Sequence, residues 1–367
     1  MVDGLYQADY WLSRYLIQRG LGLMYLIAFA VAINQFRPLV GENGLLPVPQ
    51  FLQRISFNRS PSIFHWHYSD RFFAVIAWSG LLLSLVAVTG YSESGPLWLS
   101  MGIWFVLWAL YLSIVNVGQL FYGFGWESLL LEAGFYAIFL GPLHYQAPLV
   151  MIFVIRWLVF RIEFGAGLIK MRGDQCWRDL TCLNYHHETQ PMPNPMSRYF
   201  HLMPEWFHKM ETLFNHIVQL GAVWLLFLPQ PLATIGAVLI ILSQAYLIIS
   251  GNYAWLNWMT LILAFSGISD AYLQMVLPLT IPRALIAPTA YMILLGILAI
   301  VIAYMSINPI KNMISPNQRM NASFNPLHLV NTYGAFGSVT RKRYEIIIEG
   351  TTDETITEEY RMARLRV

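Results

Sequence analysis

The decisive stretch of this chain is residues 156–216, which read RWLVFRIEFGAGLIKMRGDQCWRDLTCLNYHHETQPMPNPMSRYFHLMPEWFHKMETLFNH. It holds both cysteines and five of the nine histidines of the chain. The residues before it, and those after it up to about residue 305, are mostly apolar. The polar chemistry of an apolar chain is therefore concentrated in one segment.

The composition indicates a membrane protein. Of 367 residues, 57% are hydrophobic and only 11% are charged. A soluble domain carries about 25% charged residues, so this chain could not cover a large core in water. Runs of about 18 or more apolar residues predict helices that cross the bilayer and satisfy their own backbone there. The formal net charge of +2, without a basic stripe, gives no indication of nucleic acid as a partner.

We expect an all-α bundle with about eight or nine membrane spans. Residues 1–16 alternate aromatic and polar side chains and predict an interfacial helix. No cleavable signal peptide is expected, because acidic and basic residues are mixed within Met1–Arg19. The hydrophobic runs that predict the spans are 17–36, 72–91, 97–117, 127–141, 147–164, 212–228, 231–250, 253–268 and 282–305.

Two regions are expected: a transmembrane helical domain at 1–305 and a polar C-terminal tail at 306–367. In the tail, YEIIIEG (344–350) and the terminal EYRMARLRV favour short strands. Two short strands form a marginal hairpin at most. We therefore expect the start of a further domain, shortened here or completed by a partner chain.

The side of the membrane that carries the polar segments stays open. With nine spans, the 37–71 loop, the central segment and the tail share one side, together with glycosylation sequons at Asn58 and Asn321. The sequons favour an exocytoplasmic face, whereas the Lys and Arg residues on the same side favour the cytoplasm. We expect the exocytoplasmic arrangement.

Charged residues inside the predicted spans are the first candidates for function, because charges at membrane depth are costly unless they are paired or solvated. Arg156 and Glu163 are seven residues apart and share a helix face, with Arg161 on another face. Their partners must come from water or from other helices. Glu127 and Glu132 are the expected partners.

Several segments of the sequence resemble the lipase maturation factor family. The central ones are FGAGLIKMRGDQCWRDLTCLNYHHETQPMPNP (164–195), WFHKMETLFNH (206–216) and SGNYAWLNWMT (250–260). Supporting words are GENGLLP (41–47), FYGFGWESLLLE (121–132) and NTYGAFGSVT (331–340). The resemblance covers nearly the whole chain in order.

This resemblance implies a chaperone-like protein of the animal endoplasmic reticulum membrane, needed for secreted lipases to fold and assemble into active homodimers. Its implied partners are membrane lipid and a secreted, lipase-like client; a bacterial relative would lie in the inner membrane. Family members continue beyond the YEIIIEG region into a further domain, whereas this sequence stops at Val367.

A weaker similarity is to the membrane domain of vitamin K-dependent γ-carboxylases. It rests on AGLIK (166–170) followed by Trp177, and it implies Lys170 as a base on a reduced quinone. A second carboxylase position, which holds a histidine in that family, falls near Trp126-Glu127 of this sequence. An acid replaces the histidine here, which argues against γ-carboxylation itself. The alternative function is thus a membrane enzyme that acts on a quinone or lipid cofactor or substrate, with Lys170 as base and Glu127 and His187 as catalytic partners. If Lys170 has a structural rather than a catalytic role, it snorkels to the membrane surface or pairs with Glu163 or Asp174.

Three states stay open for Cys176 and Cys182, the only cysteines. Their spacing permits a disulfide and excludes a redox CxxC motif. Metal binding together with His186, His187 and Glu188 is the second state, but the spacing matches no common zinc pattern, so we expect no metal site. Buried thiols are the third.

The loop around the cysteines is the candidate binding surface. Arg178 is suited to bind a carboxylate or phosphate through two parallel hydrogen bonds. The alternative is a self-satisfying loop in which Asp179 and Glu188 neutralise Arg178 and Arg172. Farther on, His208 and Glu211 are three residues apart and can meet on one helix face, where a structural role is expected. The candidate residues of the loop are Arg172, Asp174, Trp177, Arg178, Asp179, His186, Glu188, Gln190 and Asn194.

Overall fold

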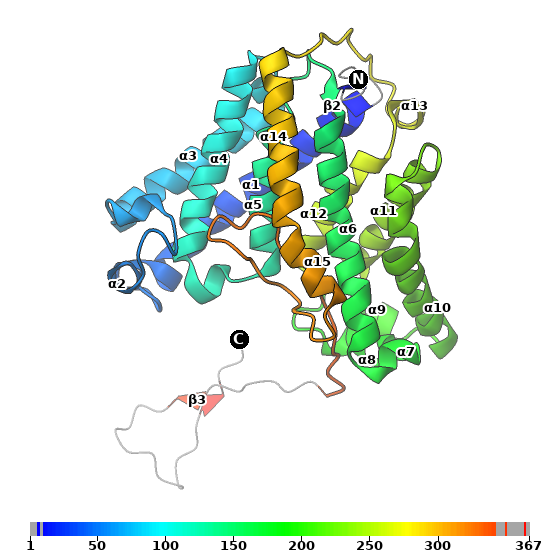
Figure 1. Cartoon of the computed structure of the whole chain (residues 1–367). Helices are drawn as coiled ribbons and strands as arrows, with labels where there is room; N and C mark the ends of the chain where they lie inside the picture. Colours follow the sequence, from blue (N-terminus) through cyan, green and yellow to red (C-terminus); the bar gives the residue numbers. More distant parts are fainter. Residues whose placement is uncertain (1–5, 8–9, 343–348, 351–362, 365–367) are drawn as a thin grey trace.

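The computed structural model describes residues 6–7, 10–342, 349–350 and 363–364. The helices of residues 10–342 form a bundle (Figure 1). Within this part of the chain, six helices or continuous helix pairs are long and apolar enough to cross a membrane. The chain is therefore a polytopic integral membrane protein. The six are α1 (Trp11–Val40), α3 (Asp70–Thr89), α4 (Leu97–Val117), α10 to η7 (Glu205–Phe227), α11 (Leu232–Ser250) and α14 with α15 (Thr289–Ile314).

Three of the nine expected spans do not meet the criteria of length and apolar composition. Helices α5 (Gly125–Ala137) and α12 (Leu256–Ala264) are too short. Helix α6 (Leu149–Arg172) is long enough but carries Arg156, Arg161, Glu163 and Lys170, all of which are buried. In Figure 1, α6 runs through the middle of the bundle beside α14, so other helices surround its charges. Protein contacts replace lipid there, which is how a bundle tolerates intramembrane charge.

The N-terminus differs from the expected interfacial helix. Strand β1 (Tyr6–Gln7) pairs antiparallel with β2 (Ala147–Pro148), and α1 begins directly afterwards at Trp11. The carboxylate of Asp270 accepts hydrogen bonds from the backbone N–H groups of Trp11 and Leu12 at 2.9 and 2.8 Å. A carboxylate at a helix N-terminus satisfies free N–H groups and opposes the helix dipole. A residue from a distant part of the chain thus fixes where α1 starts, which the local sequence does not reveal.

The core of the N-terminal half lies between α1, α3, α4 and α5. Tyr25 and Phe29 of α1 meet Tyr111 of α4 edge to face, with ring centroids 5.7 and 5.4 Å apart. Gly80 of α3 lies so close to Phe29 that an added Cβ would be 2.3 Å from the ring. The close approach of α1 and α3 therefore requires glycine at this position.

The polar segment folds into short helices at one end of α6 (Figure 1). These are α7 (Gln175–Arg178), α8 (Leu183–Thr189), α9 (Ser197–His201) and α10 (Glu205–His216). A π-helical turn, η6 (Ile217–Gly221), and a 3-10 segment, η7 (Ala222–Phe227), continue α10. The remaining short helices are α2 (Val48–Arg54), η3 (Ile63–His65), η4 (Tyr91–Glu93), η5 (Gln119–Tyr122), η8 (Phe265–Gly267) and α13 (Asp270–Leu273).

The chain after α15 (Ile307–Ile314) returns to the bundle as an irregular segment, shown in orange in Figure 1. Its residues 329–334 are buried, so the first part of the expected tail belongs to the packed structure. Strand β3 (Glu349–Gly350) pairs antiparallel with β4 (Ala363–Arg364). The other residues of the two expected strands lie outside the described part of the chain, and the division at residue 305 stays a prediction.

Candidate functional site

A cavity of about 270 Å³ lies at the polar end of α6. Its walls come from α6, α7, α8, α10, η6, α11, α12 and the segment at 333–336. Most of the wall is apolar, which is typical of a pocket that takes a small molecule with a few polar groups to orient it. The polar side chains that line it include Glu163, Lys170, His186, Glu211, Asn215, Gln219, Gln244, Tyr253 and Asn257.

Lys170 is the cation of this cavity. Its Nζ donates hydrogen bonds to Asn215 Oδ1 at 2.6 Å and to Gln219 Oε1 at 3.0 Å. The ammonium also lies 4.9 Å from the centroid of the Trp177 ring, which favours the charged form. An ammonium has three donors, so two amide acceptors leave one N–H for a further partner.

Glu163 is an acidic residue of the cavity, and it interacts with Lys170 through space rather than by direct contact. It lies two turns from Lys170 on the same face of α6, and the two groups attract one another electrostatically. Its carboxylate accepts a hydrogen bond from the Gln244 amide of α11. Neither Glu163 nor Asp174 forms an ion pair with Lys170 among the described residues. The structural interpretation of Lys170 as one half of such a pair is therefore wrong, since amides hold it instead.

His186 and Tyr253 line the cavity together with Lys170. The His186 Nε2 atom lies 2.7 Å from the Tyr253 hydroxyl, and the two rings are stacked. Burial, followed by the charges of His187 and Lys170, lowers the pKa of His186 to about 3. Burial raises the pKa of Tyr253. At neutral pH both rings are therefore uncharged, and a hydrogen bond joins Nε2 of His186 to the Tyr253 hydroxyl.

The structure does not bring together the expected trio of Lys170, Glu127 and His187. Glu127 lies on α5, where its carboxylate accepts a hydrogen bond from the Tyr111 hydroxyl, and it does not line the cavity. His187 also lies outside the lining, because neighbouring residues on a helix point about 100° apart. The histidine that lines the cavity with Lys170 is His186, not His187.

One pairing expected for the intramembrane charges is confirmed. Arg161 of α6 forms an ion pair with Glu132 of α5, and both side chains are buried. The Glu132 carboxylate also accepts hydrogen bonds from the Tyr333 hydroxyl at 2.8 Å and the Asn331 backbone N–H at 2.9 Å. This cluster therefore ties the returning segment to the bundle.

Arg156 has no acidic partner among the described residues, so the expectation of an ion pair was wrong for this residue. Its guanidinium donates to the backbone carbonyls of Ser266 and Leu226 at 2.9 and 3.0 Å. It also lies over the Tyr10 ring at 5.0 Å. Backbone carbonyls near the ends of η8 and η7 lack partners within the helix and can accept these hydrogen bonds. No sequence pattern predicts such acceptors.

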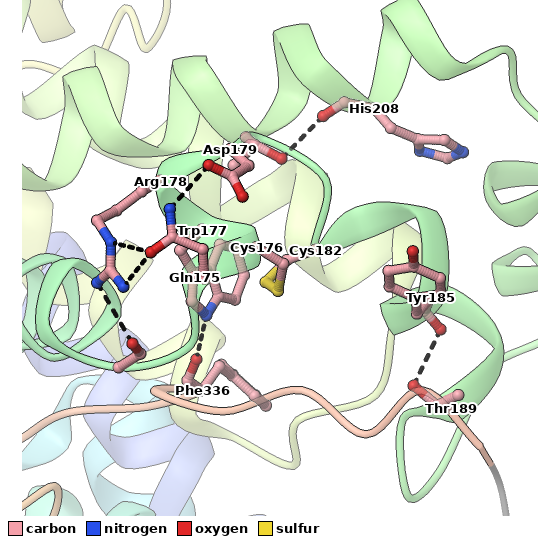
Figure 2. The surroundings of a disulfide bond; sticks show 12 residues. Gln175, Cys176, Trp177, Arg178, Asp179, Cys182, Tyr185, Thr189, His208 and Phe336 are labelled. Carbon is pink, nitrogen blue, oxygen red and sulfur yellow. Dashed lines mark hydrogen bonds between the residues drawn. A yellow bond between two sulfur atoms is a disulfide. The ribbon is translucent and has the colours of Figure 1, made fainter.

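Cys176 and Cys182 form a disulfide, which confirms one of the three expected states (Figure 2). The bond is buried with Trp177 and Val339 in a small apolar cluster. Trp177 donates its indole N–H to the Phe336 carbonyl at 2.7 Å, which joins this loop to the returning segment (Figure 2). Both sulfurs are thereby removed from any metal-binding set.

The loop around the disulfide satisfies its own charges. Arg178 donates to Gln175 Oε1 at 2.9 Å (Figure 2). It also donates to the Met171 carbonyl at 2.6 Å. Gln175 in turn donates to Asp179 at 2.9 Å. The self-satisfying alternative is thus closer to the structure than a free clamp, but Gln175 stands where an acid was expected.

The other predicted loop residues also have local partners. Arg172 donates to Gln318 at 2.7 Å, and the Asp174 backbone N–H donates to the Gly337 carbonyl at 2.8 Å. Glu188 lies 3.3 Å from the His201 ring. Two amides then hold the chain after α8: Gln190 donates to the His187 carbonyl at 2.9 Å, and Asn194 donates to the carbonyls of Ile249 and Gly251 at 2.9 and 3.0 Å.

Among the polar residues of the cavity that sequence reasoning missed are Asn215, Gln219, Gln244 and Tyr253. A signal for two of them was present. Gln219 and Gln244 are isolated amides within the apolar runs 212–228 and 231–250, and a polar residue at membrane depth marks a buried contact. Asn215 and Tyr253 lie in mixed sequence, where one more polar residue carries no signal.

These features define a polytopic helical membrane protein with an internal, mainly apolar cavity and a disulfide-bonded polar end. The chain belongs to the lipase maturation factor family, because the family's "Lipase maturation factor transmembrane domain" matches residues 12–275. The sequence resemblance to this family is thereby confirmed.

The relatives cover most of this chain. It is 42% identical to lipase maturation factor 1 of Mus musculus, over 95% of this chain and 67% of that protein. It is 40% identical to lipase maturation factor 1 of Homo sapiens over the same shares. Lipase maturation factor 2 of Xenopus laevis is 33% identical over 72% of this chain and 40% of its own length. No solved structure matches the chain. These relatives lend no support to the similarity with γ-carboxylases.

Proposed function

We propose that this protein is a membrane-embedded maturation factor that assists the folding and assembly of secreted lipases. The observation that carries the proposal is the 42% identity to a lipase maturation factor 1 over 95% of the chain. The matched domain, residues 12–275, includes most of the elements that form the cavity and the disulfide loop. In an animal cell we expect the protein in the endoplasmic reticulum membrane, and in a bacterium in the inner membrane.

The client is expected to dock on the polar end of the bundle. Five large apolar side chains are exposed on and around α9, and together they form what we call the α9 patch: Met192, Met196, Tyr199, Leu202 and Met203. These residues lie outside the six candidate membrane spans. A group of exposed apolar side chains outside the spans is typical of a protein-binding surface.

The test is a rescue experiment. The full chain is expressed in animal cells that lack lipase maturation factor 1, together with a secreted lipase. We expect the activity per mass of secreted lipase, and its homodimer fraction in sedimentation, to rise toward the values that the mouse relative restores. A secreted protein that is not a lipase serves as the control and should not change. If the chain reaches the membrane and the lipase stays inactive, the proposal is wrong.

A second candidate function rests on the position of Lys170 in an apolar cavity. A quinone or a lipid fits the chemistry of this space, with its apolar part on the wall and a polar oxygen at the free N–H of Lys170. The ammonium would then orient the bound molecule by donating to this oxygen. The role of base, which the distant carboxylase resemblance suggested, would need the neutral amine of Lys170, which takes up the proton that the bound molecule loses.

Extraction of the purified protein followed by mass spectrometry tests this function. The wild type should carry a quinone or lipid that a Lys170→Met variant loses. If neither protein carries one, this candidate fails. If a K170M variant still rescues lipase activity, Lys170 and the ligand that it binds are not needed for client maturation.

A further inference from the structure

Next to the cavity, three side chains meet that neither proposed function uses. They are His187 of α8 and His208 and Glu211 of α10. One ligand atom from each lies within 4.8 Å of the other two. The exposed fractions of the side chains are 3%, 4% and 5%, so the cluster is almost sealed from solvent. We propose that these three residues bind a divalent metal ion of the zinc type.

Unused hydrogen-bonding capacity points to a missing ligand. Both ring nitrogens of His187 are buried without a hydrogen-bond partner, and so is Oε1 of Glu211. Buried polar atoms are normally satisfied, because leaving one unpaired costs about 1–3 kcal/mol. A metal ion bound to His187 and Glu211 would satisfy a nitrogen and an oxygen at once.

The distances suit two ligands of one ion better than a hydrogen bond. Nε2 of His187 lies 3.6 Å from Oε1 of Glu211, which is too long for a hydrogen bond. With metal–ligand bonds of about 2.05 Å, two ligands of a tetrahedral zinc lie about 3.3 Å apart. A shift of a few tenths of an ångström would therefore complete this side of the site.

His208 has the arrangement of a metal-bound histidine. Its Nε2 atom faces the His201 carbonyl at 3.4 Å, and its Nδ1 atom lies 2.9 Å from Oε2 of Glu211. A ligating histidine usually donates its outer N–H to a carbonyl or carboxylate, which leaves the other nitrogen unprotonated toward the metal. With that tautomer, Nδ1 of His208 gives up its present 2.9 Å hydrogen bond to Glu211 and becomes free to bind the ion.

The charge of Glu211 also calls for a cation. Within the described chain, no lysine or arginine forms an ion pair with this carboxylate; the groups within range are the rings of His187 and His208. A buried carboxylate is stabilised by an opposite charge, and a metal dication supplies one. Two histidines with one carboxylate are the protein ligands of many open zinc sites.

Glu211 also lines the cavity that contains Lys170. A metal held by three protein ligands keeps a fourth position for water or another ligand. The ion would thus join α8 to α10 and lie beside the cavity. Sequence spacing suggested only the His208–Glu211 pair; the fold brings His187 of α8 to this pair on α10.

Zinc alone is the probe for the test. The full chain is purified in detergent, stripped with a chelator, and titrated with buffered Zn²⁺; bound metal is measured by mass spectrometry, and Co²⁺ substitution by absorption. We expect one ion per chain with a tetrahedral Co²⁺ spectrum. His187→Asn, His208→Asn and Glu211→Gln should each weaken zinc binding by about 100-fold or more, since even the loss of an outer partner costs about 10–100-fold.

Two matched histidine variants are the controls. His201→Gln removes the neighbouring ring that faces Glu188 and keeps the His201 carbonyl, and His144→Asn changes a histidine in the loop before α6. Both should bind zinc like the wild type. Zinc should also raise the unfolding temperature of the wild type and both controls but not of the three ligand variants. Because each protein is compared with itself with and without zinc, a variant of lower stability can still be tested.

The proposal is overturned if the stripped wild type takes up no stoichiometric zinc at micromolar free metal. It is equally overturned if E211Q and H187N bind zinc as tightly as the wild type. Either result would leave His208 and Glu211 as a hydrogen-bonded pair without a metal. The lipase rescue experiment does not enter this test, so the two proposals stand or fall separately.

Discussion

Arg161 and Glu132 form an ion pair between α6 and α5 that is sealed from solvent, with side-chain exposures of 1% and 0%. Asn331, Tyr333 and Tyr136 saturate the remaining oxygen sites of the carboxylate. The pair thus joins two helices and the returning segment. Removing one partner leaves an uncompensated charge in the bundle.

We therefore predict that Glu132→Gln or Arg161→Met lowers the free energy of unfolding by about 3–5 kcal/mol. The double variant should lose less than the sum of the two, because neither charge is then left alone. Unfolding in detergent, followed by circular dichroism, measures this. Glu205→Gln, which breaks the exposed pair with Lys209, is the control and should show no change. Additive losses in the double variant would contradict the prediction.

The disulfide between Cys176 and Cys182 should stabilise the polar end. For a closed loop this short, the chain-entropy estimate is about 2 kcal/mol. Replacing both cysteines with serine should therefore lower the unfolding temperature, and reductant should lower that of the wild type alone. Maleimide labelling checks the redox state: the unfolded wild type should react at both thiols only after reduction. Labelling before reduction would show that the bond is absent.

Polar substitutions in the α9 patch should impair client maturation without unfolding the protein. Leu202 and Met203 are 69% and 41% exposed, so replacing both with serine removes little packing. We expect a several-fold loss of lipase rescue at an unchanged unfolding temperature. The matched control replaces Met275 and Val276, which are both 78% exposed beyond α13, and it should rescue fully. Equal rescue by both double variants would place the client elsewhere.

His328 should make stability depend on pH. Its ring lies 3.0 Å from Ser128 Oγ and from Asn116 Oδ1, and Arg59 lines the same groove. Burial lowers the pKa of His328 to about 4. Between about pH 4 and the ordinary value of about 6.5, the unfolded chain binds more protons than the folded chain. The contribution of the neutral ring is thus complete above about pH 6.5 and is lost as the pH falls toward 4, by at most about 1.4 kcal/mol per pH unit.

A His328→Asn variant measures this contribution. The difference in unfolding temperature between the wild type and H328N should be largest at neutral pH and should shrink toward pH 4. The exposed His67 is the control, and His67→Asn should leave the pH profile parallel to that of the wild type. A difference that stays constant with pH would show that His328 does not titrate on unfolding.

Much of the architecture was predictable from local sequence. Apolar runs of bilayer length determine an all-α membrane bundle, because a buried backbone in lipid must satisfy itself within each helix. The words around FGAGLIKMRGD identified the family, and the two cysteines six positions apart were close enough for a disulfide. The start of α1 was not predictable, since Asp270 sets it from a distant part of the chain.

The site was predictable only in part. The order of residues along the chain places Lys170, Glu163 and five of the nine histidines in one polar segment. The packing of the helices then sets the contacts: Lys170 meets Asn215 and Gln219 rather than an acid, and His187 meets Glu211 rather than the cavity. The physical reason is that a side chain's partner depends on how helices rotate and pack against one another, and this rotation is set by contacts across the whole bundle, not by the spacing of residues along one helix.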